Sequence, residues 1–347
     1  MIKPRKLNFG DRVAAVSLSW GGAAKFPQRY EAGKRQLEEE FGLEVVEARH
    51  ALRDPGWLHR HPEARAEDLM EAFSDRSVRG IISIIGGDDS IRLLPHLDLE
   101  VIRSNPKVFM GYSDTTVTHW ACFKAGLCSF YGPAIMAGFA ENGGMFPYMV
   151  RSVRAMLFRA EPLGIVKASP EGWTAELLDW ADPSNQDRKR KLSPPEPWRF
   201  LQGRGVVRGR LFGGCLDVME WLRGTPIWPE PADWKGKILF LETSEDAPSP
   251  RVLVGALRSY AVMGILRNLS GVLFGRPGGG LPVPEFDAYE EAFRQVVAEE
   301  EGLGDLPIVS RMDFGHTDPM FVLPYGMLAE INCEKQQVAI LESAVIE

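Results

Sequence analysis

The sequence predicts an α/β protein with two domains, the first built on a parallel sheet and the second on a mixture of strands and helices. A length of 347 residues suits two domains, and a content of 45% hydrophobic and 25% charged residues is typical of a globular chain with a sizeable core. In the first half, apolar runs alternate with helical patterns, as in a parallel sheet covered by helices on both faces. A proline-rich stretch interrupts this alternation before strand and helix patterns return.

The elements of the first domain follow from apolar and β-branched runs that stop at glycine, serine or aspartate, and from charged stretches of helical periodicity between them. The strands expected are Arg12–Leu18, Glu44–Ala48, Gly80–Ile85 and Val108–Gly111. The helices expected are Arg29–Phe41, Pro62–Ser74, Ser90–Pro95 and Asp114–Lys124. This is the element order of a Rossmann- or flavodoxin-like domain, in which ligands bind at the carboxyl ends of the strands.

A long irregular stretch, 161–205, comes next. It contains six prolines, three tryptophans and the basic run Arg188–Lys191. Stretches of this length without a regular pattern are usually linkers or working loops. We therefore expect an N-terminal domain at 1–160, a linker and loop at 161–205, and a C-terminal domain at 206–347.

The second domain again shows runs of apolar residues that end at polar turns. The strands expected are Val206–Leu211, Gly236–Glu242, Gly271–Phe274, Pro307–Arg311 and Val338–Glu342. The helices expected are Leu216–Arg223, Arg251–Met263 and Glu285–Glu301.

Composition argues against several classes of function. The formal net charge is -7, from 47 acidic and 40 basic residues mixed along the chain, so no basic face is evident for a nucleic acid polymer. No stretch approaches the roughly 20 apolar residues that cross a bilayer, and the apolar run after the basic start is too short for a secretory signal. The cysteines lack paired spacing, which fits free thiols: Cys122, Cys128, Cys215 and Cys333. We expect a cytoplasmic protein that binds neither nucleic acid polymers nor membranes.

The best candidate nucleophile is Ser113, in the turn Gly111-Tyr112-Ser113-Asp114 between a predicted strand and a predicted helix. A serine on such a turn projects its hydroxyl outward, and the backbone N–H of the next residue, Asp114, points toward the place where an oxyanion would form. The motif alone leaves a second interpretation open, in which Ser113 only caps its helix.

A general base is sought among six histidines: His50, His59, His61, His96, His119 and His316. His119 lies on the helix after Ser113, and its side chain is expected to point away from the turn. His316 differs, because it follows a predicted strand in a loop where glycine and proline favour a conformation that aims an imidazole. Glu242 ends a hydrophobic strand and is the best candidate for the carboxylate that orients such a base. The alternative is that Glu242 only ends its strand in solvent.

The sequence offers little support for metal or phosphate-loop chemistry. The acid pairs Asp88-Asp89 and Glu245-Asp246 are adjacent rather than spaced to converge, and no HxH or HExxH pattern is present. The run Gly278–Gly280 lacks the strand-to-helix setting of a phosphate loop and is interpreted as a flexible turn.

Taken together, the contexts of Ser113, Glu242 and His316 resemble the LD-carboxypeptidase family of serine peptidases, which also holds the microcin C self-immunity peptidases. The resemblance runs over nearly the whole chain. It rests on the motifs Gly10–Ser17, Ile85-Gly86-Gly87, Gly111–Thr115, Gly209–Leu211 with Gly213-Gly214, Leu241-Glu242, Gly315-His316-Thr317 and Leu323–Gly326.

The resemblance implies an α/β N-terminal domain joined to a smaller β-rich C-terminal domain, commonly in a homodimer, without metal or cofactor. Ser113 is then the nucleophile, His316 the general base and later general acid, and Glu242 the residue that orients it. The oxyanion would be bound by backbone N–H groups of Asp114 and of the Gly86-Gly87 turn. One departure from the family is Cys215, which stands where asparagine is usual.

Within the family, one branch removes D-alanine from murein peptides and the other cleaves the amide between an aminoacyl or peptidyl group and a nucleotide-like moiety. Two features resemble the second branch: the segment Glu242-Thr243-Ser244-Glu245 and a long loop, about 179–200, like the one that covers the nucleotide. Trp180 and Trp198 are expected to stack on a base, with ordinary packing as the alternative. The run Arg188–Lys191 either meets a phosphate or is a solvated loop.

The function expected is therefore a serine peptidase or amidase acting through an acyl-enzyme on aminoacyl-nucleotide-like compounds. The first alternative is an LD-carboxypeptidase acting on murein tetrapeptide. The second is a ligand-binding protein without catalysis, against which the three triad candidates argue.

Overall fold

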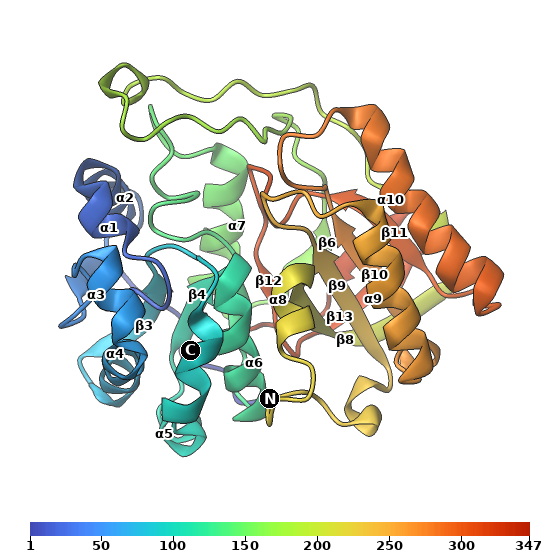
Figure 1. Ribbon diagram of the computed structural model, residues 1–347, viewed down its shortest axis with the longest axis horizontal. Coiled ribbons are helices and arrows are strands. Elements are labelled where there is room, and N and C mark those ends of the chain that lie inside the picture. The colour runs from blue at the N-terminus through green and yellow to red at the C-terminus, as the bar shows by residue number, and fades with distance from the viewer.

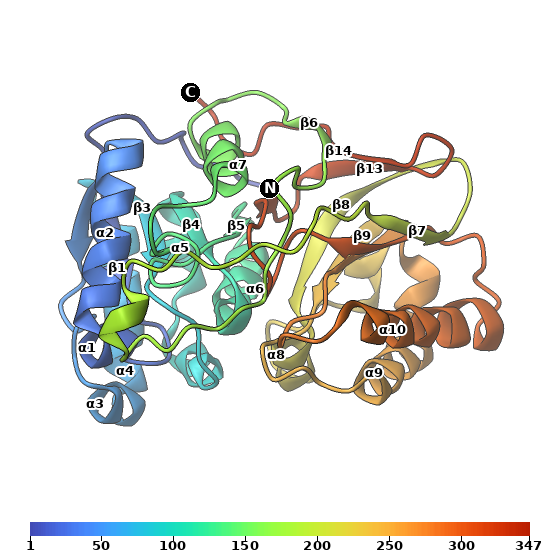
Figure 2. The ribbon, with the colours of Figure 1, turned by 90° about the horizontal axis from the view of Figure 1, so that it is seen from above.

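Two sheets lie side by side in the computed structural model, which describes residues 1–347 (Figures 1 and 2). The first sheet has the order β12-β5-β4-β3-β1-β2 and is parallel except for β12, which pairs antiparallel with β5. Its strands are β1 (Arg12–Val16), β2 (Glu44–Glu47), β3 (Val78–Ser83), β4 (Val108–Gly111), β5 (Phe130–Tyr131) and β12 (Leu323–Pro324). The order 2-1-3-4-5 of the parallel strands is the flavodoxin-like one.

Helices connect the parallel strands of the first sheet, as right-handed crossovers require. They are α1 (Gly22–Lys25), α2 (Pro27–Phe41), α3 (Pro55–Arg60), α4 (Pro62–Ser74), α5 (Leu99–Ser104) and α6 (Thr116–Lys124), with short 3₁₀ turns at η1 (Ser90–His96) and η2 (Ser113–Thr115). Helix α7 (Pro147–Leu157) follows β5 and leads to the second sheet. Proline at the first position of α2, α3, α4 and α7 starts these helices, because its missing N–H has no partner there in any case.

The second sheet has the order β6-β14-β13-β8-β9-β10-β11-β7. Its strands are β6 (Gly164–Val166), β7 (Arg199–Gln202), β8 (Val206–Cys215), β9 (Lys237–Glu242), β10 (Gly271–Gly275), β11 (Ile308–Met312), β13 (Leu328–Asn332) and β14 (Gln337–Ile340). The central strands β8 to β11 are parallel, and the outer strands pair antiparallel. The helices here are α8 (Leu216–Trp221), α9 (Pro250–Val262) and α10 (Phe286–Phe293), which continues as a π-helix over Arg294–Glu300.

The fold class expected from the sequence is confirmed, and the differences concern short or edge elements. Strands β6 and β7 form within the stretch expected to be irregular, 161–205, because each gains its hydrogen bonds from a strand far away in the sequence, β14 and β11. Strands β5 and β12 have two residues each and are strands only through their neighbours. Such elements carry no periodicity of their own.

The two sheets share one continuous hydrophobic core. A cluster of 72 buried residues draws on both sheets, while a smaller cluster of 16 lies between the first sheet and helices such as α4. Trp120 of α6 packs on Phe212 of β8 with ring centroids 4.6 Å apart, and its indole N–H donates to the carbonyl of Gly213 at 2.8 Å. This packing ties α6 of the first sheet to β8 of the second.

The stretch after β6 runs as a long loop above both sheets, from the region of α1 and α2 to that of α10 (Figure 1). The side-chain amide of Gln28 on α2 donates to the carbonyl of Trp180 at 2.9 Å, which ties the loop to the first domain. No helix combines the length and the apolar character that crossing a bilayer requires.

Candidate active site

Ser113 occupies a tight turn between β4 and α6, as the sequence predicts. Its φ angle is +62°, a left-handed conformation that is rare for a residue other than glycine and is often found at functional sites. The turn needs glycine at position 111, where a Cβ atom would come within 2.7 Å of Thr115 and 2.9 Å of Ser83. The buried carboxylate of Asp114 accepts the N–H and the hydroxyl of Ser90 at 2.9 and 2.7 Å, which fixes the turn to η1.

Ser113, His316 and Glu242 form one hydrogen-bonded chain. The Ser113 Oγ atom lies 3.0 Å from His316 Nε2, and His316 Nδ1 lies 2.6 Å from Glu242 Oε2. Glu242, at the end of β9, is fully buried, and a Cβ atom at Gly315 would sit 2.6 Å from its carboxylate. The absence of a side chain at Gly315, whose φ angle is +93°, therefore lets the His316 loop close on Glu242.

Tyr131 completes this chain on the side away from the histidine. Its hydroxyl accepts the backbone N–H of Ser113 at 3.0 Å and donates a short hydrogen bond to Glu242 Oε1. One fully buried phenol thus links the turn that carries the serine to the carboxylate that orients the histidine. Tyr131 comes from β5, a two-residue strand without a sequence signal, so sequence reasoning missed it.

Glu245 is a second carboxylate at the histidine. Its Oε2 atom lies 3.0 Å from His316 Nε2, the same nitrogen that faces Ser113. Burial lowers the pKa of His316, but Glu242 and Glu245 outweigh burial and raise it to about 10. The hydrogen bond with His316 in turn lowers the pKa of Glu245 to about 2. The sequence marks Glu245 only as part of an acid pair and of the segment Glu242-Thr243-Ser244-Glu245, and neither pattern predicts a contact with His316.

The two glycines of the predicted oxyanion site have different surroundings. A Cβ atom at Gly86 would lie 3.2 Å from Ser113 Oγ and 3.6 Å from the backbone nitrogen of Asp114. A Cβ atom at Gly87 would instead meet Ser19 at 2.3 Å. Gly86 is therefore the glycine whose missing side chain leaves room beside the serine hydroxyl.

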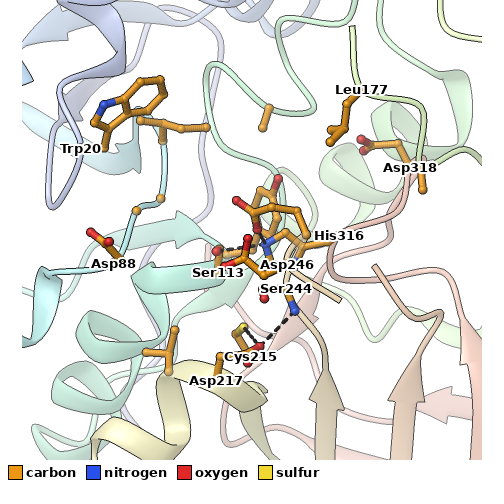
Figure 3. Close-up of a pocket in the computed structure, with 18 of the residues that line it drawn as sticks. Trp20, Asp88, Ser113, Leu177, Cys215, Asp217, Ser244, Asp246, His316 and Asp318 are labelled. Atoms are coloured by element: carbon orange, nitrogen blue, oxygen red, sulfur yellow. Dashed lines mark hydrogen bonds and ion pairs between the residues drawn. The ribbon is translucent and has the colours of Figure 1, made fainter. Parts of the chain in front are cut away.

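A cavity of about 800 Å³ opens above Ser113, within the range of small-molecule sites. Figure 3 shows Ser113 and His316 in its centre with Asp246 and Ser244 beside them, Trp20 and Asp88 to one side, and Cys215 and Asp217 below. The long loop contributes Ala175–Leu178, Trp180 and Arg190 to the lining.

The two tryptophans expected to contact substrate have different positions. Trp180 lines the cavity, packs edge-on against Phe26 with ring centroids 5.7 Å apart, and carries the Arg29 guanidinium 5.0 Å above its ring. Trp198 does not line it: its indole N–H donates to Asp313 at 2.8 Å and its ring packs against Phe321. The structure therefore corrects the prediction that Trp198 binds substrate, because packing in the second domain occupies its ring.

The basic run of the loop is largely neutralised within the protein. Arg190 donates to Glu141 at 2.7 Å and to Asp318 at 2.7 Å, and Arg188 pairs with Glu176. Of these cations only Arg190 lines the cavity.

The remaining predicted candidates lie outside the chemistry. His119 is fully buried, its ring nitrogens lie 2.9 Å from the Gly111 carbonyl and 2.8 Å from the Ser129 hydroxyl, and burial lowers its pKa to about 3. It is therefore a neutral core residue. Cys215 Sγ lies within 4.8 Å of ligand atoms of Glu242 and His316, but burial and the nearby Glu242 raise the pKa of its thiol well above the usual value.

Ser113 lies on a strand-to-helix turn beside a cavity, within hydrogen-bond reach of a histidine that a buried carboxylate holds. This arrangement is typical of the serine hydrolases. Comparison with known sequences specifies the family. The LD-carboxypeptidase N-terminal domain matches residues 13–132, and the LD-carboxypeptidase C-terminal domain matches residues 208–331. The chain belongs to the LD-carboxypeptidase family.

Two solved structures and two relatives illustrate what the chain is similar to. The crystal structure of an MccF-like protein from Streptococcus pneumoniae in complex with AMP is 30% identical, with a TM-score of 0.85 over 96% of this chain and 99% of that one. The microcin C7 self-immunity protein MccF of Escherichia coli is 27% identical over 97% of this chain and 94% of its own length. A structure of MccF with glutamyl sulfamoyl guanosine has a TM-score of 0.83 at 26% identity over the whole of both chains. A Bacillus subtilis protein named "Probable murein peptide carboxypeptidase" is 25% identical over 99% of this chain and 96% of its own length.

Proposed function

We propose that this protein is a serine amidase that hydrolyses the amide between an aminoacyl or peptidyl group and a nucleotide-like moiety. Ser113 acts as nucleophile, His316 as general base and acid, and Glu242 as the residue that orients the imidazole. The observation that carries the proposal is the hydrogen-bonded chain from Ser113 through His316 to Glu242 in the wall of the cavity.

In the first half of the reaction, neutral His316 takes the hydroxyl proton at Nε2 while Ser113 Oγ bonds to the substrate carbonyl carbon. Glu242 holds the proton on Nδ1 and stabilises the imidazolium that forms. The negative charge that develops on the carbonyl oxygen falls beside the Asp114 N–H and the Gly86-Gly87 turn, which we assign as the oxyanion site. The imidazolium then gives its proton to the amide nitrogen, and the C–N bond breaks.

In the second half, water takes the place of the leaving group. His316 removes a proton from the water, the hydroxide adds to the acyl carbon, and the ester bond to Ser113 breaks as its oxygen is reprotonated. Tyr131 holds both ends of the array in place during these steps, because its hydroxyl contacts the Ser113 backbone and the Glu242 carboxylate.

The loop end of the cavity supports a nucleotide-like leaving group. Trp180 offers an aromatic face, and Arg29 lies over that ring without a carboxylate within ion-pair distance. Burial lowers the pKa of Arg29 to about 10 and outweighs the nearby Glu141 and Asp318, which raise it. An aromatic ring beside an unpaired guanidinium suits a base next to an anionic linkage. The MccF and MccF-like structures were solved with ligands of this chemistry, glutamyl sulfamoyl guanosine and AMP.

A parallel assay tests the proposal. Wild type is expected to cleave an aminoacyl sulfamoyl adenosine and to leave a tetrapeptide ending in D-alanine intact, while Ser113→Ala stays folded and binds the adenosine compound without cleaving it. Trp180→Ala is expected to raise KM about 5- to 150-fold, the equivalent of a stacking energy of roughly 1–3 kcal/mol, and Trp180→Phe to raise it less. Turnover by Ser113→Ala at the wild-type rate would refute the mechanism.

The second candidate is a murein peptide carboxypeptidase, which the Bacillus subtilis relative favours. The mechanism is unchanged, and release of D-alanine from the tetrapeptide with no cleavage of the adenosine compound would establish it.

We also propose the division into 1–160, 161–205 and 206–347, with the middle part covering the substrate, and a homodimer as the assembled form. Limited proteolysis with and without ligand tests the domain division and the covering role, because bound ligand should protect residues 161–205 from cleavage. Sedimentation of the purified protein tests the homodimer.

A further inference from the structure

The turn Gly86–Ser90 passes beside the Ser113 hydroxyl, and Asp88 marks it in Figure 3. It begins with two glycines, which have more conformational freedom to lose than any other residue. The N–H groups of Gly86 and Gly87 donate no hydrogen bond within the protein, and neither does the N–H of Asp114. The donors assigned to the oxyanion are therefore free, but the glycines that carry two of them cannot hold their own position.

Ser19, just beyond the end of β1, holds this turn from one side. Its Oγ atom accepts the N–H of Asp88 at 3.1 Å and that of Asp89 at 3.2 Å, and it donates to the Asp89 carboxylate at 3.2 Å. A hydroxyl has one donor and two acceptor sites, so the turn uses all three. A Cβ atom at Gly87 would lie 2.3 Å from this oxygen, so the missing side chain lets Ser19 reach the turn.

Fully buried Arg65, on α4, fixes the carboxylate that Ser19 contacts. Its two terminal nitrogens donate to the two oxygens of Asp89 at 2.6 and 3.2 Å, and one of them also donates to the carbonyl of Leu18 at 2.7 Å. A buried ion pair adds little to stability, because removing its charges from water offsets their attraction. What this pair does is join the end of β1 to the turn through one guanidinium.

Ser90 ties the other end of the turn to the residue after the nucleophile. Its Oγ atom lies 2.7 Å from a carboxylate oxygen of Asp114 and 2.8 Å from the Asp114 carbonyl oxygen, and its N–H donates to the carboxylate at 2.9 Å. Neither Ser19 nor Ser90 lines the cavity. These two serines can therefore influence the reaction only through the backbone that they hold.

We propose that Ser19 and Ser90 are positioning residues that fix the oxyanion donors relative to the Ser113 hydroxyl. Ser19 takes up the two N–H groups that follow the glycines and leaves those of the glycines for the oxyanion. Ser90 sets the distance from the turn to the N–H of Asp114. Donors that are already in place stabilise the charge of the transition state without any reorganisation during the reaction. The inference rests on the acyl-enzyme mechanism of the proposed function and is independent of the leaving group.

Three buried serines allow the same substitution to be compared at three sites, with alanyl sulfamoyl adenosine as substrate. Ser19→Ala and Ser90→Ala should each lower kcat on the order of 10- to 100-fold at unchanged KM, because a displaced donor loses charge stabilisation while the substrate loses no contact. Ser17→Ala is the matched control and should keep both constants. Ser17 is 1% exposed and follows the same strand, but its hydroxyl donates to the carbonyl of Ala51 at 2.7 Å and does not touch the turn.

The pH dependence of kcat/KM separates this role from a disturbance of the triad. The acidic limb should stay at the wild-type pH in Ser19→Ala and Ser90→Ala, because neither serine contacts His316. A shifted limb would mean that the substitutions act on the base rather than on the oxyanion donors. A loss of kcat in Ser17→Ala equal to that in Ser19→Ala would mean that any buried hydroxyl at this strand end has the effect. Either result would overturn the proposal.

The remaining outcomes distinguish this proposal from the proposed function. Wild-type kcat in Ser19→Ala or in Ser90→Ala would overturn the positioning role and leave the proposed function standing. If wild type cleaves only the tetrapeptide ending in D-alanine, the same variants decide on that substrate. Cleavage of neither compound by wild type would overturn both proposals. If Ser19→Ala does not fold, Ser90→Ala decides, because it keeps the backbone N–H bond to Asp114.

Discussion

Replacing Glu245 by glutamine tests how the protonation of His316 is controlled. Nε2 of His316 lies 3.0 Å from both Ser113 Oγ and Glu245 Oε2. A neutral imidazole with its proton on Nδ1 can accept the serine hydroxyl at Nε2, whereas only an imidazolium can donate there to a carboxylate. Glu245 therefore stabilises the form of His316 that cannot act as a base.

The magnitude follows from the exposure of this pair. Two unit charges at 3.0 Å interact by about 1.4 kcal/mol in water. The Glu245 side chain is 57% exposed, and exposed pairs contribute at most about 1 kcal/mol. Since one pKa unit corresponds to about 1.4 kcal/mol, Glu245→Gln should lower the pKa of His316 by roughly 0.7.

The assay is the pH dependence of kcat/KM with alanyl sulfamoyl adenosine as substrate. The acidic limb of this profile reports the base of the free enzyme. Because the base must be neutral, a lower pKa moves the acidic limb of Glu245→Gln to lower pH by roughly 0.7 and raises the rate below the limb about fivefold. Asp246→Asn, which removes the neighbouring charge, should move the limb less. An unmoved limb, or a plateau as low as that of Ser113→Ala, would show that this reasoning is wrong.

Three other substitutions test the architecture. Tyr131→Phe removes the hydroxyl shared by Ser113 and Glu242, so kcat should fall on the order of 10- to 100-fold at unchanged KM, as steady-state kinetics would show. Gly86→Ala places a methyl group 3.2 Å from Ser113 Oγ and should lower kcat at least about tenfold with little change in melting temperature; wild-type kcat would exclude the assigned oxyanion site. His119→Ala empties a fully buried position and should lower the free energy of unfolding by about 2–5 kcal/mol in a denaturant titration. An unchanged free energy of unfolding would contradict the packing of His119 against Tyr325.

Much of the site could be predicted because its main residues stand at the ends of regular elements. Ser113 follows β4, Glu242 ends β9, and His316 follows β11, each next to a glycine or an apolar run that is visible in the sequence. Parallel strands bring their carboxyl ends to one edge, so these positions are candidates before any contact is known.

Other parts of the site depend on contacts between residues far apart in the chain. Tyr131 and Glu242 are 111 positions apart, and nothing local marks the phenol as their link. Trp180 and Trp198 belong to the same irregular stretch of the sequence, yet one reaches the cavity and the other packs against Phe321. The choice between them is made by the path of the loop over both sheets.

The sequence by itself therefore determined the α/β class, the turn that carries Ser113, and His316 and Glu242 as its candidate partners, because periodicity and turn chemistry are local properties. Only the tertiary structure decided that these three side chains meet, that Tyr131 joins them, and that Glu245 competes with Ser113 for His316. These features are set by packing two sheets through one core, and such packing is a property of the whole chain.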